Sequence, residues 1–218
     1  MKHRRVAVLM GGLSAERDVS LSSGEAVAAG LEEAGHEVIR IDVTRDLDLR
    51  LREADCDAAF VVLHGRWGED GTVQGMLEMM GIPYTGSPVL ASSLAMDKVR
   101  TREILASRGI PVAPGGSQVA NPSPALPAGL DFPVVVKPAA EGSSVGISIV
   151  RDQAQLEPAL REAWKCCELA LIEEFIAGVE VNVAVFDEEV LGAVEIEPHS
   201  EFYDYSAKYD EGGSTHHI

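Results

Sequence analysis

Strand-like and helix-like segments alternate along residues 1–96, and this alternation constrains the fold more than any other feature of the sequence. Short apolar runs predict four strands, at residues 6–10, 37–42, 58–63 and 82–85. Between the first two runs, apolar residues recur at helical spacing until Gly35, where the helix should end. A methionine-rich helix is predicted around residues 76–80. Strands that alternate with helices predict an α/β domain, with a parallel sheet and helices on its faces.

Polar residues and glycines cluster where these predicted strands end. In an open parallel sheet the ligand site lies at the carboxyl ends of the strands. Seven residues of this kind follow three of the predicted strands: Gly11, Gly12, Ser14, His64, Gly65, Gly86 and Ser87. We therefore expect a ligand site at this edge of the sheet. His64 also has a plainer interpretation, as a buried histidine that is satisfied by a backbone carbonyl.

A different pattern begins near Ala95. Asp97 is placed to cap a helix from Lys98 to Arg108, and Gly109 is placed to end it. The next segment, residues 111–133, holds six of the chain's 11 prolines, which is typical of a connector or an irregular edge and not of the core. After it, strands are predicted at residues 134–137, 146–150, 170–174, 181–186 and 190–197, with a helix at 155–167. This part is predicted to be a mixed α+β region.

The charge and composition of the chain exclude several classes of protein. A net charge of −17 over 218 residues argues against a surface that binds nucleic acid or an anionic membrane. The apolar runs are too short for a membrane span or a signal peptide, so we expect a cytoplasmic protein. The cysteines, Cys56, Cys166 and Cys167, are odd in number and lack CxxC spacing, which predicts reduced thiols and no zinc site.

Lysine is scarce, at 5 of the 18 basic residues, and three lysines lie in segments suited to phosphate chemistry: Lys98, Lys137 and Lys208. Lysine supplies a compact, flexible point charge. Lys137 ends an apolar strand and precedes a loop rich in glycine and serine, residues 141–146. Because the P-loop and dinucleotide-binding glycine motifs are both absent, a nucleotide would have to be held in another way. The strand lysine, this loop and the later run at residues 171–176 fit a nucleotide held between two sheets. There the segment at 173–176 would meet the base through backbone groups, and Glu180 would accept hydrogen bonds from the ribose.

Six motifs in order along the chain identify it as similar to the D-alanine:D-alanine ligases of the ATP-grasp superfamily. They lie at residues 11–20, 63–75, 84–87, 96–98, 137–146 and 202–209. The resemblance implies a Rossmann-like parallel-sheet N-terminal domain followed by an ATP-grasp α+β region, with the C-terminal part incomplete. It implies three segments: a substrate-binding domain at 1–96, a central ATP-grasp subdomain at 97–180, and the start of the C-terminal ATP-grasp domain at 181–218.

The resemblance also implies an ADP-forming ligase that joins two D-alanines, through an acyl phosphate, for peptidoglycan precursor synthesis. ATP and D-alanine would be its ligands, and the protein would be a homodimer. Eight residues would bind ATP: Lys98, Lys137, Ser144, Glu173, Glu174, Ile176, Glu180 and Lys208. Both chemical steps build negative charge on oxygen, so cationic groups and preorganised hydrogen-bond donors suit the site.

The family pattern places the first D-alanine at Val19 and His64, and at a hydrogen-bonded triad of Glu16, Ser143 and Tyr209. Glu16 would bind the ammonium group of that D-alanine. A carboxylate in the first turn of a helix is also favourable without any ligand, so a structural role for Glu16 stays open.

The family's ligands for Mg²⁺ or Mn²⁺ are expected beyond Ile218, so no residue of this chain is assigned to a metal. For that reason a non-catalytic ATP-grasp fragment or nucleotide-binding module remains an alternative, as does another ATP-grasp ligase that joins a different carboxylate and amine. Three further clusters have structural interpretations. His216 and His217 are predicted to form a polar loop tail, residues 187–189 a hairpin turn, and Glu195 and Glu197 part of a strand without a metal.

Overall fold

The computed structural model describes residues 3–120, 125–142, 144–199 and 213–218. The chain divides into two compact units, Met1–Thr101 and Arg102–Ile218, and the boundary falls inside helix α5 (Lys98–Ser107). Ser143, Lys208 and Tyr209, which are predicted site residues, lie outside the described residues.

The first unit is built on a three-stranded parallel sheet in the order β2-β1-β3. Its strands are β1 (Arg5–Met10), β2 (Glu37–Asp42) and β3 (Ala58–Val61). These are the apolar runs of the sequence, and the predicted α/β class with a parallel sheet is confirmed. The predicted strand at 82–85 is reduced to one parallel bridge, between Ala59 and Tyr84. The pairing stops there because the Thr85 hydroxyl, and not a backbone carbonyl, accepts the hydrogen bond of the Val61 amide, at 3.0 Å.

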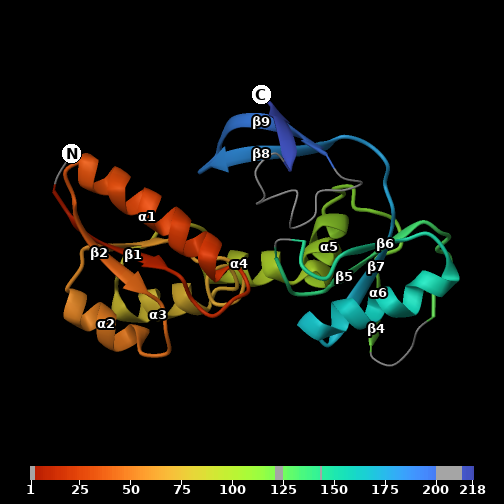
Figure 1. The fold of residues 1–218 in the computed structure, drawn as a ribbon, viewed down its shortest axis with the longest axis horizontal. Coiled ribbons are helices and arrows are strands. Elements are labelled where there is room, and N and C mark those ends of the chain that lie inside the picture. Colours follow the sequence, from red (N-terminus) through yellow and green to blue (C-terminus); the bar gives the residue numbers. More distant parts are fainter. Residues whose placement is uncertain (1–2, 121–124, 143, 200–212) are drawn as a thin grey trace. The chain divides into compact units, whose positions relative to one another are not determined.

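Helices cover both faces of this sheet, with α1 (Arg17–Glu33) on one face and α2 (Leu47–Ala54) and α3 (Thr72–Met80) on the other (Figure 1). The side chains of β1 alternate between the two faces. The cluster toward α2 and α3 contains Ala7, Leu9, Leu51 and Leu77. The cluster toward α1 contains Val8, Met10 and Ala28. Because β1 buries side chains on both of its faces, it packs against helices on both sides of the sheet and joins the three layers of the unit. Each fully buried leucine contributes about 1.5–3 kcal/mol to the stability of this packing.

Two helices follow the sheet, α4 (Val89–Met96) and the first turn of α5. The carboxylate of Asp97 accepts hydrogen bonds from the backbone amides of Val99 and Arg100, both at 3.0 Å. A helix begins with amides that have no partner inside the helix, and an aspartate at this position supplies one. The predicted capping role of Asp97 is confirmed.

The second unit contains a four-stranded antiparallel sheet in the order β4-β7-β5-β6. Its strands are β4 (Ser117–Ala120), β5 (Val134–Pro138), β6 (Ser148–Val150) and β7 (Leu169–Glu174). Helix α6 (Gln153–Cys166) packs on one face through Leu156 and Leu160, which contact alternate residues of the strands. Residues 111–133 are predicted to form a connector or an irregular edge. The edge is what the structure contains, because β4 lies in this segment and pairs with β7 at the edge of the sheet.

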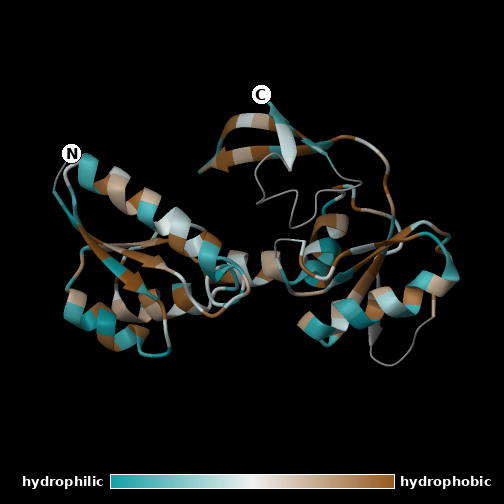
Figure 2. Cartoon of the chain, in the orientation of Figure 1, coloured by the Kyte–Doolittle hydropathy of each residue, from teal (hydrophilic) through white to brown (hydrophobic). Residues whose placement is uncertain are grey.

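A second antiparallel sheet has the order β10-β9-β8 and consists of β8 (Glu180–Phe186), β9 (Glu189–Pro198) and β10 (Ser214–His217). The predicted turn between β8 and β9 is confirmed, and Asp187 adopts a positive φ of 56° there. The prediction that His216 and His217 form a loop tail is wrong, because β10 pairs with β9 over these residues. His217 Nε2 lies 2.9 Å from Glu197 Oε2. Figure 2 shows brown, apolar stretches along β8 and β9, where Val181, Val183 and Val185 are exposed.

Candidate functional site

A tight glycine turn follows β1 in the first unit. Gly11 and Gly12 have φ angles of 76° and 82°, a region that residues with a side chain rarely adopt. The Gly11 amide donates a hydrogen bond to Ser20 Oγ at 2.9 Å, and the Ser20 hydroxyl donates to the carbonyl of Val62 at 2.6 Å. Ser20 therefore ties helix α1 both to the turn after β1 and to the segment after β3.

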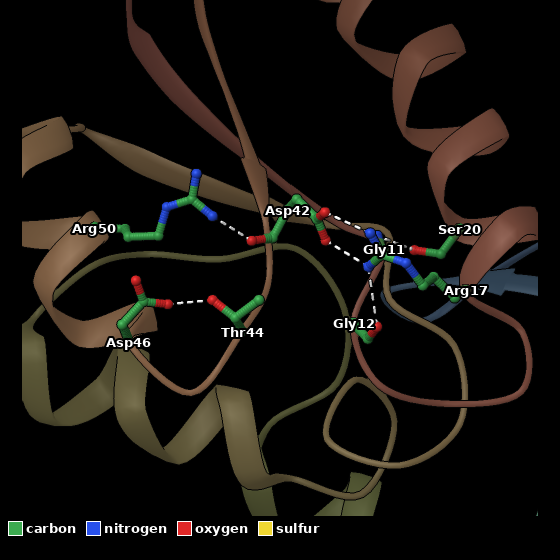
Figure 3. Close-up of polar contacts among 8 residues, drawn as sticks. All are labelled: Gly11, Gly12, Arg17, Ser20, Asp42, Thr44, Asp46 and Arg50. Atoms are coloured by element: carbon green, nitrogen blue, oxygen red, sulfur yellow. Dashed lines mark hydrogen bonds and ion pairs between the residues drawn. The ribbon is translucent and has the colours of Figure 1, made fainter.

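An ion pair between Arg17 and Asp42 holds the same turn from the other side (Figure 3). The guanidinium donates to both carboxylate oxygens, at 2.6 and 2.5 Å, and also to the carbonyl of Gly12, at 3.1 Å. These hydrogen bonds from Arg17 hold the pKa of Asp42 below its usual range, because they favour the charged carboxylate. A Cβ at Gly11 would lie only 2.3 Å from Asp42 Oδ1, so the ion pair leaves room for glycine alone.

Glu16 is at the N-cap of α1, four residues after Gly12, and is 4% exposed. Its carboxylate lies against the loop that follows β3, since a Cβ built at Gly65 would be 3.1 Å from Glu16 Oε2. Val19 is half-buried in the first turn of the same helix. The structure thus brings Glu16 beside the loop that carries His64, two features that are far apart in the sequence.

The loop after β3 is fixed by its own acidic side chains. The Gly65 amide donates to Glu69 Oε2 at 2.7 Å, and the Trp67 amide donates to Asp70 Oδ2 at 3.0 Å. Gln74 of α3 donates from Nε2 to the carbonyl of Gly68 at 2.6 Å. These hydrogen bonds hold the backbone of the loop in place, although this stretch is neither helix nor strand.

A cavity of about 380 Å³ lies at the carboxyl end of β3. His64 and Gln74 line it together with residues 85–87 and with small residues of α4. Among the described residues, His64 Nε2 and Gln74 Oε1 are buried and have no hydrogen-bond partner. A buried polar atom without a partner costs about 1–3 kcal/mol, so this cavity favours a small polar ligand. The predicted position of the ligand site, at this edge of the sheet, agrees with the cavity.

Lys137 and Glu173 form an ion pair in the second unit, with a carboxylate side chain that is 6% exposed. Both residues lie on the face of the β4-β7-β5-β6 sheet that is opposite α6, because Val136 and Ile172 beside them pack toward the helix. Glu173 pairs with Val135 across the ladder, so Lys137 is its diagonal neighbour on the same face. The sheet therefore presents a lysine next to a buried carboxylate.

The glycine- and serine-rich loop, residues 141–146, begins four residues after Lys137. Ser144 and Gly146 have positive φ angles of 58° and 71°. The amide of Val145 donates a hydrogen bond to the carbonyl of Gly142 at 3.2 Å, and the amide of Ile147 donates to the carbonyl of Ser144 at 3.4 Å. A loop of this composition beside a lysine supplies a hydroxyl and a point charge, which are groups that bind phosphate.

Three further predicted nucleotide residues, Glu174, Ile176 and Glu180, are exposed in the structure. Glu174 ends β7, Glu180 begins β8, and the exposed fraction of Ile176 is 59%. The amides of Glu174 and Phe175 already donate to the carbonyls of Pro114 and Pro133, both at 3.1 Å. Contact of this segment with an adenine therefore stays a prediction.

The predicted lysines belong to different units. Lys98 begins α5 in the first unit, and Lys137 lies on β5 in the second. Convergence of the lysines on one triphosphate stays a prediction. Sequence reasoning missed Arg102, which forms a second ion pair with Glu173.

Over residues 3–120, 125–142, 144–199 and 213–218, no group of three or more His, Cys, Asp or Glu side chains is arranged to hold a metal ion. None of the helices in that part of the chain has the length and apolar character needed to cross a bilayer.

A parallel-sheet unit with a polar cavity, followed by an antiparallel unit with a lysine beside a glycine- and serine-rich loop, contains the parts of an ATP-grasp ligase. Comparison with known proteins agrees. The family description "D-ala D-ala ligase N-terminus" matches residues 47–87, and "D-ala D-ala ligase C-terminus" matches residues 117–218.

Individual relatives give the same result. The D-alanine–D-alanine ligase of Citrifermentans bemidjiense is 54% identical over 99% of this chain and 70% of its own length. That of Geobacter sulfurreducens is 49% identical over 99% of this chain and 69% of its own. A crystal structure of the D-alanine–D-alanine ligase of Bacillus anthracis complexed with ATP superposes with a TM-score of 0.82 at 33% identity, covering 99% of this chain and 70% of that one. The chain belongs to the D-alanine–D-alanine ligase family.

Proposed function

We propose that this protein joins two D-alanines to D-alanyl-D-alanine with conversion of ATP to ADP and phosphate, for peptidoglycan precursor synthesis in the cytoplasm. The observation that carries the proposal is the position of Lys137, which lies beside the buried carboxylate of Glu173 and shortly before the loop that contains Ser144. This combination offers a charge and hydrogen-bond donors to a phosphate. The relatives' name supplies the substrate class.

In the first step, a carboxylate oxygen of one D-alanine attacks the γ-phosphorus of ATP, ADP leaves, and an acyl phosphate forms. Lys137 offsets negative charge on the transferring phosphoryl group, and Ser144 closes over the phosphates with the neighbouring amides. Lys98 and Lys208 are further phosphate ligands in this proposal. Glu173, Glu174 and Ile176 would meet the adenine, and Glu180 the ribose.

In the second step, the amine of the other D-alanine attacks the acyl carbon, phosphate leaves, and the amine loses a proton. Glu16 holds the ammonium group of the first D-alanine, because its carboxylate is buried beside the loop after β3. His64 and Val19 line the same substrate position. Glu16, Ser143 and Tyr209 would form a hydrogen-bonded triad that orients this substrate and keeps water away from the acyl phosphate.

We expect Mg²⁺ to accompany ATP, as it does in phosphoryl transfer generally. The described residues offer no cluster that fits the ion, so no step is assigned to it. A homodimer is the assembly we propose, in keeping with the family resemblance.

The test is turnover by the full-length protein with ATP, Mg²⁺ and D-alanine. We expect phosphate release that depends on D-alanine, together with D-alanyl-D-alanine detected by mass spectrometry. L-alanine is the matched control and should give background release only. Absence of D-alanine-dependent phosphate release contradicts the proposal, and a preference for an L-amino acid indicates a different ATP-grasp ligase.

A further inference from the structure

Glu173 is shared by two cations. One carboxylate oxygen pairs with Lys137, and the other accepts a hydrogen bond from Arg102 Nη1. Arg102 lies on α5 and is 71 residues away from Glu173 in the sequence. The side chain of Arg102 is 16% exposed and that of Glu173 is 6% exposed, so this second ion pair is largely removed from solvent.

Arg102 is enclosed by the segment that leads into β4. Its Nη2 donates to the carbonyl of Ala113 at 2.7 Å. A Cβ at Gly116 would lie 2.1 Å from the same Nη2, so the glycine backbone packs directly on the guanidinium. The planar guanidinium therefore has a fixed position, between the segment that leads into β4 and Glu173 of β7.

A buried carboxylate is costly when it is left without a cation, and removal of one partner from a buried pair is strongly destabilising. Lys137 has to move its ammonium group toward a phosphate in order to bind a nucleotide. If Lys137 were the only cation beside Glu173, this movement would leave the carboxylate uncompensated near an incoming anion. Arg102 removes that cost, because it remains on the other oxygen of the carboxylate.

We propose that Arg102 is a positioning residue for nucleotide binding, which neutralises Glu173 so that Lys137 is available to the phosphates of ATP. The inference rests on the proposed function, in which Lys137 binds ATP. A purely structural role, in which Arg102 only joins the connector to β7, makes a different prediction. Such a role would lower stability and would act independently of the charge on Glu173.

The experiment measures ATP affinity of the full-length protein by isothermal titration calorimetry in the presence of Mg²⁺. Arg102→Gln keeps a donor for the Ala113 carbonyl but removes the positive charge. We expect it to weaken ATP binding by about tenfold or more, with less than about threefold change in the KM for D-alanine. Arg102→Lys, which keeps the charge, should restore most of the affinity. Arg108→Met, at the residue that follows this helix, is the control and should bind ATP like the wild type.

The decisive comparison is a double-mutant cycle with Glu173→Gln. When residue 173 is a neutral amide, loss of the Arg102 charge should matter little, so Arg102→Gln/Glu173→Gln should bind ATP within about threefold of Glu173→Gln. This comparison holds even if the Arg102→Gln single variant does not fold. A drop of about tenfold between these two variants overturns the inference, as does unchanged ATP affinity of a folded Arg102→Gln protein. If the wild type does not bind ATP at all, the proposed function fails as well.

Discussion

Arg17 and Asp42 are joined by two hydrogen bonds, at 2.6 and 2.5 Å, although they are 25 residues apart in the sequence (Figure 3). The pair closes on the turn formed by Gly11 and Gly12, and Arg17 follows the buried Glu16 directly. Asp42 is the last residue of β2 and Arg17 is the first residue of α1, so this ion pair joins the end of the strand to the start of the helix. A charged network at the end of the sheet holds the carboxylate that we assign to the substrate.

Gly11→Ala should destabilise the protein by about 2 kcal/mol or more, because a positive φ is strained for alanine. The added Cβ would also lie 2.3 Å from Asp42 Oδ1 and 2.7 Å from Arg17 Nη1, so the ion pair would have to move. Urea unfolding followed by Trp67 fluorescence, in a Trp164→Phe background, reports on the first unit.

Gly30→Ala is the matched control for this measurement. Gly30 lies in the last turn of α1, and a Cβ there meets nothing within 4 Å. Alanine is the better helix former, so this change should stabilise the same transition by about 0.5–1 kcal/mol. Equal effects of the two substitutions would contradict the assigned role of the turn.

Asp42→Asn should destabilise the first unit most at neutral pH. The hydrogen bonds from Arg17 depress the pKa of Asp42 in the folded state. A depressed carboxyl contributes its full stabilisation above the unfolded value, about 3.9, and loses it as the pH falls through the lower folded value. Melting temperatures of wild type and variant should therefore converge below about pH 4. In an Arg17→Met background the convergence should disappear, and a penalty that stays constant down to pH 3 would refute the assignment.

Much of the fold follows from local sequence pattern. The strands β1, β2 and β3 are short apolar runs, and α6 begins within two residues of the predicted helix start at 155. The elements that were missed depend on distant partners. β4 is an edge strand inside a proline-rich segment, and its pairing with β7, about fifty residues later, leaves no local signal. The strand β10 depends on β9 in the same way.

The residues of the candidate site also fall into a group that local sequence pattern predicts and a group that depends on distant contacts. Glu16, His64 and Lys137 lie in motifs that the sequence displays, whereas Asp42 and Arg102 act through contacts between residues that are far apart. A partial signal existed for Arg102. It follows Lys98 by four residues, which places both on one face of a helix, but nothing local indicates that Glu173 would meet it.

Asp152→Ala should reduce stability by about 1 kcal/mol, because Asp152 caps helix α6. Its Oδ1 accepts hydrogen bonds from the amides of Ala154 at 2.9 Å and Gln155 at 3.1 Å. Asp152→Asn keeps an acceptor at the same place and should cost only a few tenths of a kcal/mol. Urea unfolding followed by Trp164 fluorescence, in a Trp67→Phe background, measures both variants. A loss of the same size for alanine and asparagine would show that the cap is not the cause.

The two substrate positions should respond separately to mutation. Lys137→Met removes the cation nearest the serine loop but leaves Glu173 paired with Arg102. We expect the KM for ATP to rise about tenfold to a hundredfold, because a hydrogen bond to a charged group contributes about 1.5–3 kcal/mol.

Glu16→Gln, in the other unit, keeps the size of the buried side chain and removes the charge that is proposed to hold the ammonium group of D-alanine. The KM for D-alanine should rise by a similar factor, with the KM for ATP changed less than about threefold. Initial rates at varied ATP and varied D-alanine separate the two effects. A defect confined to one substrate position should leave the KM for the other substrate unchanged. If either variant raised the KM for ATP and the KM for D-alanine by the same factor, the assignment of the two substrates to separate units would be wrong.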